Sequence, residues 1–195
     1  MVLITFLLSF FSWLFAPVLK PESNLKPLTT SVSADKNLAS ENIAWSSDRR
    51  LNWDDFKGLP EEGNPHHAVT AANLAVDAKC SNNEFVYEVK CVFLATQSWS
   101  KNKKSEKLLY HEQLHFDLTE VHARLLRKKL AALGTTCTNM KDRMNPTVAE
   151  AFKTWKAEQL EFDELSRHGL DAEVQQVWAD NISKRLQELE AYKKM

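Results

Sequence analysis

Two histidines and a glutamate in the stretch LLYHEQLHFDLTE, residues 108–120, have the types and the spacing of a zinc site. At about 100° per residue, His111 and His115 lie on one face of a helix, one turn apart, so both imidazoles can bind one ion. Glu112 lies about 100° around the helix from His111, where it can reach a water held by that ion. The HExxH spacing therefore predicts a zinc centre in which Glu112 acts as general base.

The same pattern allows a second interpretation, in which both histidines belong to the core and bind no metal. They share a helical stripe with five leucines, and such a stripe is normally the buried face of a helix. These leucines are Leu108, Leu118, Leu125, Leu126 and Leu133. Two histidines beside a glutamate on such a face favour the metal centre. His122 lies about 16 Å along the axis from His111 and is expected to pack or to make a structural hydrogen bond. Glu120, on the opposite face, is expected to be solvated.

A zinc site needs at least a third protein ligand, and the stretch FDELSRHG, residues 162–169, offers two candidates. His168 lies where the helix breaks before a glycine, and it is the favoured third ligand. Asp163 lies close to the apolar face of that helix. It is either the alternative ligand or a group that orients a ligand histidine. His66 and His67, in a polar loop, are a less favoured source.

Strands followed by helices must position these residues. Residues 43 to about 99 suit strands and turns, and β-branched and aromatic residues indicate a hairpin. The expected elements are strands over 69–80 and 85–94, then helices over 104–133, from the Asn-Pro-Thr start at 145–147 to 168–169, and over 171–192. The order predicts an α+β fold, with a β-hairpin or meander packed on three long helices. The strand over 85–94 is expected to offer an edge to an extended peptide.

The N-terminal residues predict export. Residues 1–18 are an almost unbroken apolar run, read as a signal peptide or an uncleaved membrane anchor. Residues 19–42 are expected to be a flexible linker, and residues 43–195 the folded domain. Three cysteines, Cys80, Cys91 and Cys137, suit one disulfide and one free thiol in an exported protein, with the pair left open. The expected location is periplasmic, extracellular or membrane-anchored facing outward.

Composition argues against several classes of partner. A net charge of -1 gives no basic field for nucleic acid, and four glycines form no phosphate-binding loop. The expected partner is a peptide or protein substrate, with membrane contact only through the N-terminal segment.

Several stretches resemble a family of uncharacterised bacterial envelope proteins that are described as secreted zinc-dependent proteases. They are RLNWDDFKG (50–58), SW (98–99), residues 108–130, FDELSRHG and QQVW (175–178). The resemblance implies a zincin-like domain with one Zn²⁺, held by His111 and His115, with Glu112 as base. The family pattern has a tyrosine where this chain has Phe162, which leaves Tyr110 or Arg124 as a candidate oxyanion stabiliser. The expected function is therefore a secreted or envelope-tethered zinc-dependent metallopeptidase. The alternative is a non-catalytic zinc-binding envelope protein.

Overall fold

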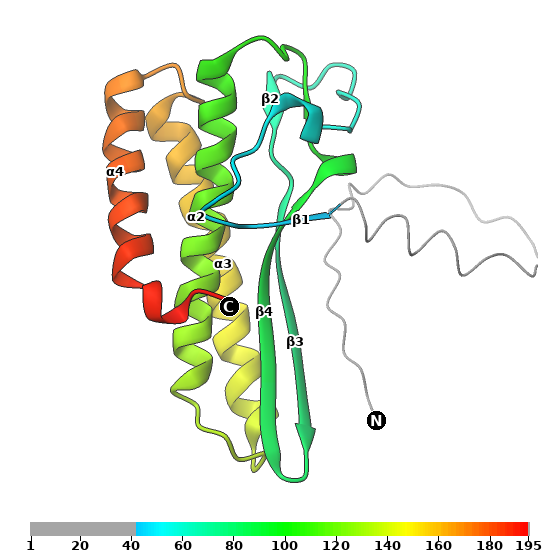
Figure 1. Ribbon diagram of the computed structural model, residues 1–195, viewed down its shortest axis with the longest axis vertical. Helices are drawn as coiled ribbons and strands as arrows, with labels where there is room; N and C mark the ends of the chain where they lie inside the picture. Colours follow the sequence, from blue (N-terminus) through cyan, green and yellow to red (C-terminus); the bar gives the residue numbers. More distant parts are fainter. Residues whose placement is uncertain (1–41, 195) are drawn as a thin grey trace, which may run out of the picture.

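The computed structural model describes residues 42–194, so the predicted export segment and nearly all of the predicted linker lie outside the described residues. Strands and short 3₁₀ turns come first and three long helices follow, which confirms the α+β fold (Figure 1). The elements are β1 (Asn42–Ala44), η1 (Trp53–Asp55), β2 (Ala68–Val69), β3 (Ala72–Ser81), β4 (Glu84–Leu94), η2 (Ala95–Gln97), β5 (Trp99–Ser100), α2 (Glu106–Ala131), α3 (Met140–Ser166), α4 (Ala172–Glu188) and η3 (Glu190–Tyr192).

The predicted hairpin is confirmed. β3 and β4 pair antiparallel from Ala72 opposite Phe93 to Ser81 opposite Glu84. Its turn, Asn82–Asn83, has positive φ at both residues, a conformation that asparagine tolerates and that suits the twist of a hairpin. β4 is the middle strand, however, in the order β1-β4-β3, and Val89 also accepts hydrogen bonds from Arg127. The expectation that β4 offers a free edge to a peptide is therefore wrong.

α2 is the central helix, with the hairpin on one side and α3 and α4 on the other (Figure 1). It begins after Ser105, whose hydroxyl accepts a hydrogen bond from the Leu108 amide at 3.2 Å. Because α2 is covered on more than one face, Glu120 is only 2% exposed. Its carboxylate pairs with Arg124 at 3.0 Å and Arg127 at 2.8 Å. The expectation that Glu120 is solvated is wrong, since it assumed a helix with a single buried face.

The motif HEQLHFD uses two sides of α2. Its histidines face α3, whereas Gln113 and Asp117 bind the segment before η1. The Gln113 side chain accepts from the Leu51 amide at 2.7 Å and donates to Asp117 at 2.8 Å. Asp117 also accepts from Trp45 at 2.8 Å and Arg50 at 3.0 Å. The motif therefore anchors residues 45–51 as well as forming the helix face that carries the histidines.

Helix α3 starts earlier than predicted, at Met140, so Pro146 lies inside the helix. The start follows the disulfide between Cys80 and Cys137, which joins the tip of β3 to the α2–α3 connection. Cys91 is the free, buried cysteine. Met140, 3% exposed, is buried just beyond this link. Tertiary contacts thus override the local start signal at the Asn-Pro-Thr stretch.

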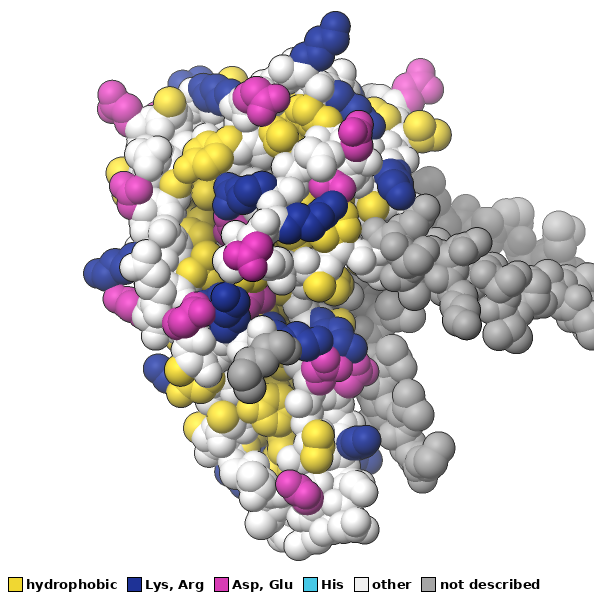
Figure 2. Space-filling view, in the orientation of Figure 1, with side chains coloured by type: hydrophobic (Ala, Val, Ile, Leu, Met, Phe, Trp, Pro, Cys, Tyr) yellow, Lys and Arg dark blue, Asp and Glu magenta, His cyan; other side chains and the backbone are white. Residues whose placement is uncertain are grey.

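Two surface properties bear on function. Among the described helices, none combines the length and apolar character needed to cross a membrane. On the face of the described chain seen in Figure 2, acidic and basic side chains are intermixed, and no histidine is visible. This face therefore presents no single-sign patch of the kind that binds nucleic acid.

Candidate metal centre

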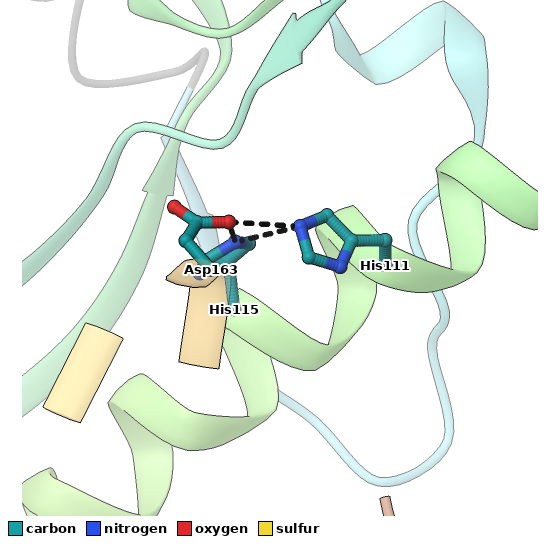
Figure 3. A group of neighbouring side chains, drawn as sticks. All are labelled: His111, His115 and Asp163. Atoms are coloured by element: carbon teal, nitrogen blue, oxygen red, sulfur yellow. Dashed lines mark hydrogen bonds and ion pairs between the residues drawn. The ribbon is translucent and has the colours of Figure 1, made fainter. Parts of the chain in front are cut away.

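Three potential ligand atoms converge between α2 and α3 (Figure 3). Nε2 of His111 lies 3.1 Å from Nε2 of His115, and each lies 3.0 Å from Oδ1 of Asp163. The ligand atoms of a tetrahedral zinc ion, with bonds of about 2.0–2.1 Å, are about 3.3 Å apart. The triangle is thus close to the size that such an ion requires. Its two imidazoles and one carboxylate are a donor set that zinc accepts.

Two glutamines fix the imidazoles from behind. Oε1 of Gln175 lies 3.0 Å from Nδ1 of His111, and Oε1 of Gln159 lies 2.6 Å from Nδ1 of His115. The Gln159 amide nitrogen donates to the His115 carbonyl and to Thr119 Oγ1, both at 3.0 Å, so its oxygen faces the ring. An amide oxygen only accepts, so Nδ1 carries the proton. Both Nε2 atoms then present lone pairs to the centre, as metal ligands must.

Phe162 completes the packing behind the ligands. Its ring is fully buried, with its centroid 4.8 Å from the ring centroid of each ligand histidine and 5.4 Å from that of Trp178. At this position an aromatic ring holds both imidazoles in place. The departure from the tyrosine of the family pattern therefore keeps the packing and removes a hydroxyl.

The electrostatics of the centre favour positive charge. Burial raises the pKa of Asp163, but hydrogen bonds from Nε2 of His111 and His115, which form when these imidazoles are fully protonated in the absence of a metal, outweigh it and hold that pKa well below its usual range. Burial lowers the pKa of His115, but the hydrogen bond and charge of Asp163, together with the charge of Glu112, outweigh it, so the pKa of His115 is raised. A site that stabilises a proton on an imidazole also stabilises a metal cation in the same place.

Glu112 is buried beside the triangle, with 3% of its surface exposed. Its charge acts on His115, and its backbone carbonyl accepts a hydrogen bond from Thr70 at 3.2 Å. Within residues 42–194, no hydrogen bond or ion pair of the Glu112 carboxylate is present. Within the described chain, the fully buried side-chain polar atom without a partner is Nε1 of Trp53, so the Glu112 oxygens stay in reach of water beside the ligands.

His168, the favoured third ligand, does not belong to the triangle, and Asp163 occupies that place. The reason is the end of α3. The helix stops at Ser166, and Arg167, His168 and Gly169 all have positive φ. This turn places His168 Nδ1 3.2 Å from Asp163 Oδ1, and the His168 side chain stays exposed to solvent. His66 reaches the same region, with its ring centroid 5.2 Å from that of His168.

The two candidate oxyanion stabilisers lie elsewhere. Arg124 is 1% exposed and donates to Glu120, to the Leu186 carbonyl and to Glu190. It is 13 residues beyond His111, or about 20 Å along the axis, so it cannot serve this centre. Tyr110 lines a hollow between α2, α4 and residues 45–50. The structure does not bring either residue to the ligand triangle. His122 makes the expected structural hydrogen bond, to Glu158 at 2.5 Å.

Sequence reasoning missed Gln159 and Gln175. Gln159 lies four residues before Asp163, so the two share a helix face, and this spacing was a usable signal. Gln175 lies in the QQVW stretch, but its contact with His111 depends on how α4 packs. Gly169 permits that packing, because a Cβ there would lie 2.9 Å from Gln175 Oε1 and 3.0 Å from the His111 Cβ.

A family model matches residues 57–169, which include all three converging ligands and Glu112. The chain belongs to this family, described as "Bacterial protein of unknown function (DUF922)". The family's description names no activity. Comparison with curated proteins and with solved structures gives no match.

Proposed function

We propose that this protein is a zinc-dependent peptidase that hydrolyses peptide bonds in a peptide or protein substrate. The observation that carries the proposal is the Glu112 carboxylate, which makes no hydrogen bond or ion pair within the described chain, keeps its oxygens in reach of water and follows the ligand His111 directly in the chain. A carboxylate beside metal ligands that is free of competing hydrogen bonds and in reach of water can accept a proton from that water.

Each residue has a distinct role in this proposal. His111, His115 and Asp163 hold the ion, which supplies a Lewis acid and lowers the pKa of water when bound. Glu112 accepts a proton from the attacking water and returns it to the leaving amine. Gln159 and Gln175 keep the protons of both imidazoles on Nδ1.

The proposed location is outside the cytoplasm, in the periplasm, in the medium or at the membrane through residues 1–18. The Cys80–Cys137 disulfide supports it, because such bonds persist in oxidising compartments.

A second candidate function is a zinc-binding envelope module without hydrolytic activity. The specific observation in its favour concerns the oxyanion. Phe162 has no hydroxyl, Arg124 is engaged far from the ligands, and Tyr110 lines a hollow outside the ligand triangle. Zinc bound without hydrolysis would then serve stability or binding.

Substitution of Glu112 by glutamine separates these functions. In zinc-loaded full-length protein, E112Q should retain the metal and lower kcat/KM on an unfolded protein substrate such as casein by about 10²–10⁴-fold. The matched control is E106Q, the same change at an exposed position of α2, which should keep full activity.

Undiminished hydrolysis by metal-loaded E112Q would contradict the role of Glu112. A wild type that binds zinc stoichiometrically but cleaves no peptide in a diverse library would favour the non-catalytic module. Wild type that binds no zinc, and shows no thermal shift when zinc is added, would return the pair to the core-histidine interpretation.

A further inference from the structure

Three imidazole nitrogens surround one oxygen of Asp163. Oδ1 lies 3.0 Å from Nε2 of His111, 3.0 Å from Nε2 of His115 and 3.2 Å from Nδ1 of His168. The first two belong to the inner centre, and His168 lies outside it. Within the described residues the second oxygen, Oδ2, makes no hydrogen bond or ion pair, and it points away from both inner histidines (Figure 3). Asp163 thus has one oxygen, Oδ2, that the inner centre does not use.

The backbone holds His168 beside that carboxylate. Arg167 and His168 have φ of 52° and 54°, which is uncommon for residues other than glycine and persists only where surrounding structure enforces it. The His168 amide donates to the Asp163 carbonyl at 2.8 Å. Gly169 packs against His111 so closely that a Cβ would lie 3.0 Å from it. The turn is therefore fixed against the inner centre, while 58% of the His168 side chain stays exposed.

A second loop brings another imidazole to the same place. The rings of His66 and His168 meet edge to face, with centroids 5.2 Å apart. The His66 amide is bonded to the Asn64 side chain at 3.0 Å, and the neighbouring His67 carbonyl accepts from Lys101 at 2.8 Å, so the loop is anchored on both sides. Two exposed imidazoles from distant segments thus meet beside the Asp163 carboxylate, where His168 contacts Oδ1 and His66 contacts His168.

We propose that His66, His168 and Asp163 form an outer site for a second divalent cation, adjacent to the inner centre. Imidazole ligands favour Zn²⁺, Cu²⁺ and Ni²⁺ over Mg²⁺ and Ca²⁺. Asp163 is shared, in the manner of the two-metal sites of hydrolases, where the ions are about 3.5–4 Å apart. Among the described residues the inner three are the ones whose ligand atoms already converge, so the exposed imidazoles of His66 and His168 would have to rotate to meet the ion. The outer ion would be the weaker of the two for this reason and because its ligands are solvated. The proposal extends the metal centre of the proposed function and does not depend on hydrolysis.

Zinc stoichiometry tests the outer site. Full-length protein dialysed against buffered zinc should hold two ions, and calorimetric titration should resolve two affinities. H66A and H168N should each keep the inner ion and weaken the outer one by about tenfold or more, the scale for loss of even a supporting residue. Asparagine is chosen at 168 because it tolerates positive φ. H67A, the adjacent exposed histidine, is the matched control and should still hold two ions.

The outcomes are distinguishable from those for the proposed function. Wild type that holds one ion, or a second ion that H66A and H168N retain with unchanged affinity, overturns the outer site and leaves the inner centre intact. Two ions in wild type, one in H66A and H168N, and no peptide cleavage by any of them would support the outer site while the peptidase proposal fails. Wild type without any bound zinc would overturn both.

Discussion

The two halves of α2 bury polar groups in opposite ways. In the second half, Glu120 is matched by Arg124 and Arg127, and the arginines also donate to Glu190 and to three backbone carbonyls. Positive and negative charges there are equal in number. In the first half, Asp163 of α3 contacts two imidazoles whose Nδ1 atoms are committed to glutamines, and the charge of Glu112 acts on one of them, His115. In the described part of the chain, neither carboxylate pairs with a lysine or an arginine.

The difference separates a structural network from a site. The cluster around Glu120 satisfies its own donors and acceptors, so it needs nothing from solution. The cluster around Asp163 gathers lone pairs and negative charge that a cation would balance, as the proposed zinc centre requires. Burial of charge alone does not distinguish the two, whereas the balance of charge does.

The largest expected effect lies in the balanced half. Arg127→Met removes one of the two arginines that pair with Glu120 and the donor to the Val89 and Tyr192 carbonyls, so negative charge in the cluster is no longer balanced and the free energy of unfolding should fall by about 3–5 kcal/mol. Urea unfolding with and without zinc measures it, and the loss should be the same in both. Lys129→Met, a change at an exposed position two residues along α2, is the control and should lie within about 0.5 kcal/mol of wild type. A loss that disappears when zinc is added would show that the halves are coupled.

Metal removal should affect only the unbalanced half. At zinc concentrations about 1,000 times Kd, binding stabilises the folded state by about 4 kcal/mol, or about 8–16 °C in Tm for a domain of this size. A chelator should remove this increment from wild type. Asp163→Asn, which keeps the shape and loses the charge, should show little increment at the same zinc concentration. An equal zinc-dependent shift in D163N would exclude Asp163 as a ligand.

The helices and strands were easier to predict from the sequence than the tertiary contacts that their side chains make. HExxH placed both histidines on one face of α2, and hairpin, helices and order followed from periodicity. Periodicity did not show that Asp163, rather than His168, lies with the two ligand histidines. That depends on where α3 ends and on a left-handed turn that only tertiary contacts enforce. The burial of Glu120 was missed for a related reason. Periodicity identifies the faces of a helix, and it does not say that two of them are covered.

Loss of a glutamine that orients a ligand imidazole should lower the zinc affinity less than loss of a ligand. Gln175→Leu removes the acceptor for Nδ1 of His111 and leaves the ligand in place, so zinc affinity should fall by about 10–100-fold. Competition with a chromophoric chelator measures it. Gln176→Leu, the exposed neighbour, should bind zinc as wild type does. Unchanged affinity in Q175L would mean that packing by Phe162 is sufficient to orient the ring.

The smallest expected effect is a pH dependence in the second half of α2, where Glu158 of α3 binds His122 of α2 and Arg185 of α4. Burial raises the pKa of Glu158, but the hydrogen bonds from His122 and Arg185 outweigh it and lower that pKa from 4.5 to about 2. A carboxyl whose pKa is lower in the folded state stabilises the fold above pH 4.5, and this contribution is lost as the pH falls from 4.5 towards 2. After allowance for solvent screening the loss is about 1–2 kcal/mol.

Urea unfolding of metal-free protein between pH 5 and about pH 2.5 tests this, because chelation removes the metal-linked protons from the comparison. Glu158→Gln should flatten the curve relative to wild type, whereas Glu164→Gln, an exposed glutamate on the same helix, should leave it unchanged. If E158Q loses stability with the same slope as wild type, the acid sensitivity belongs to other carboxylates. The three-helix contact would then resemble the balanced half of α2 only in geometry, because its charge would add nothing to stability.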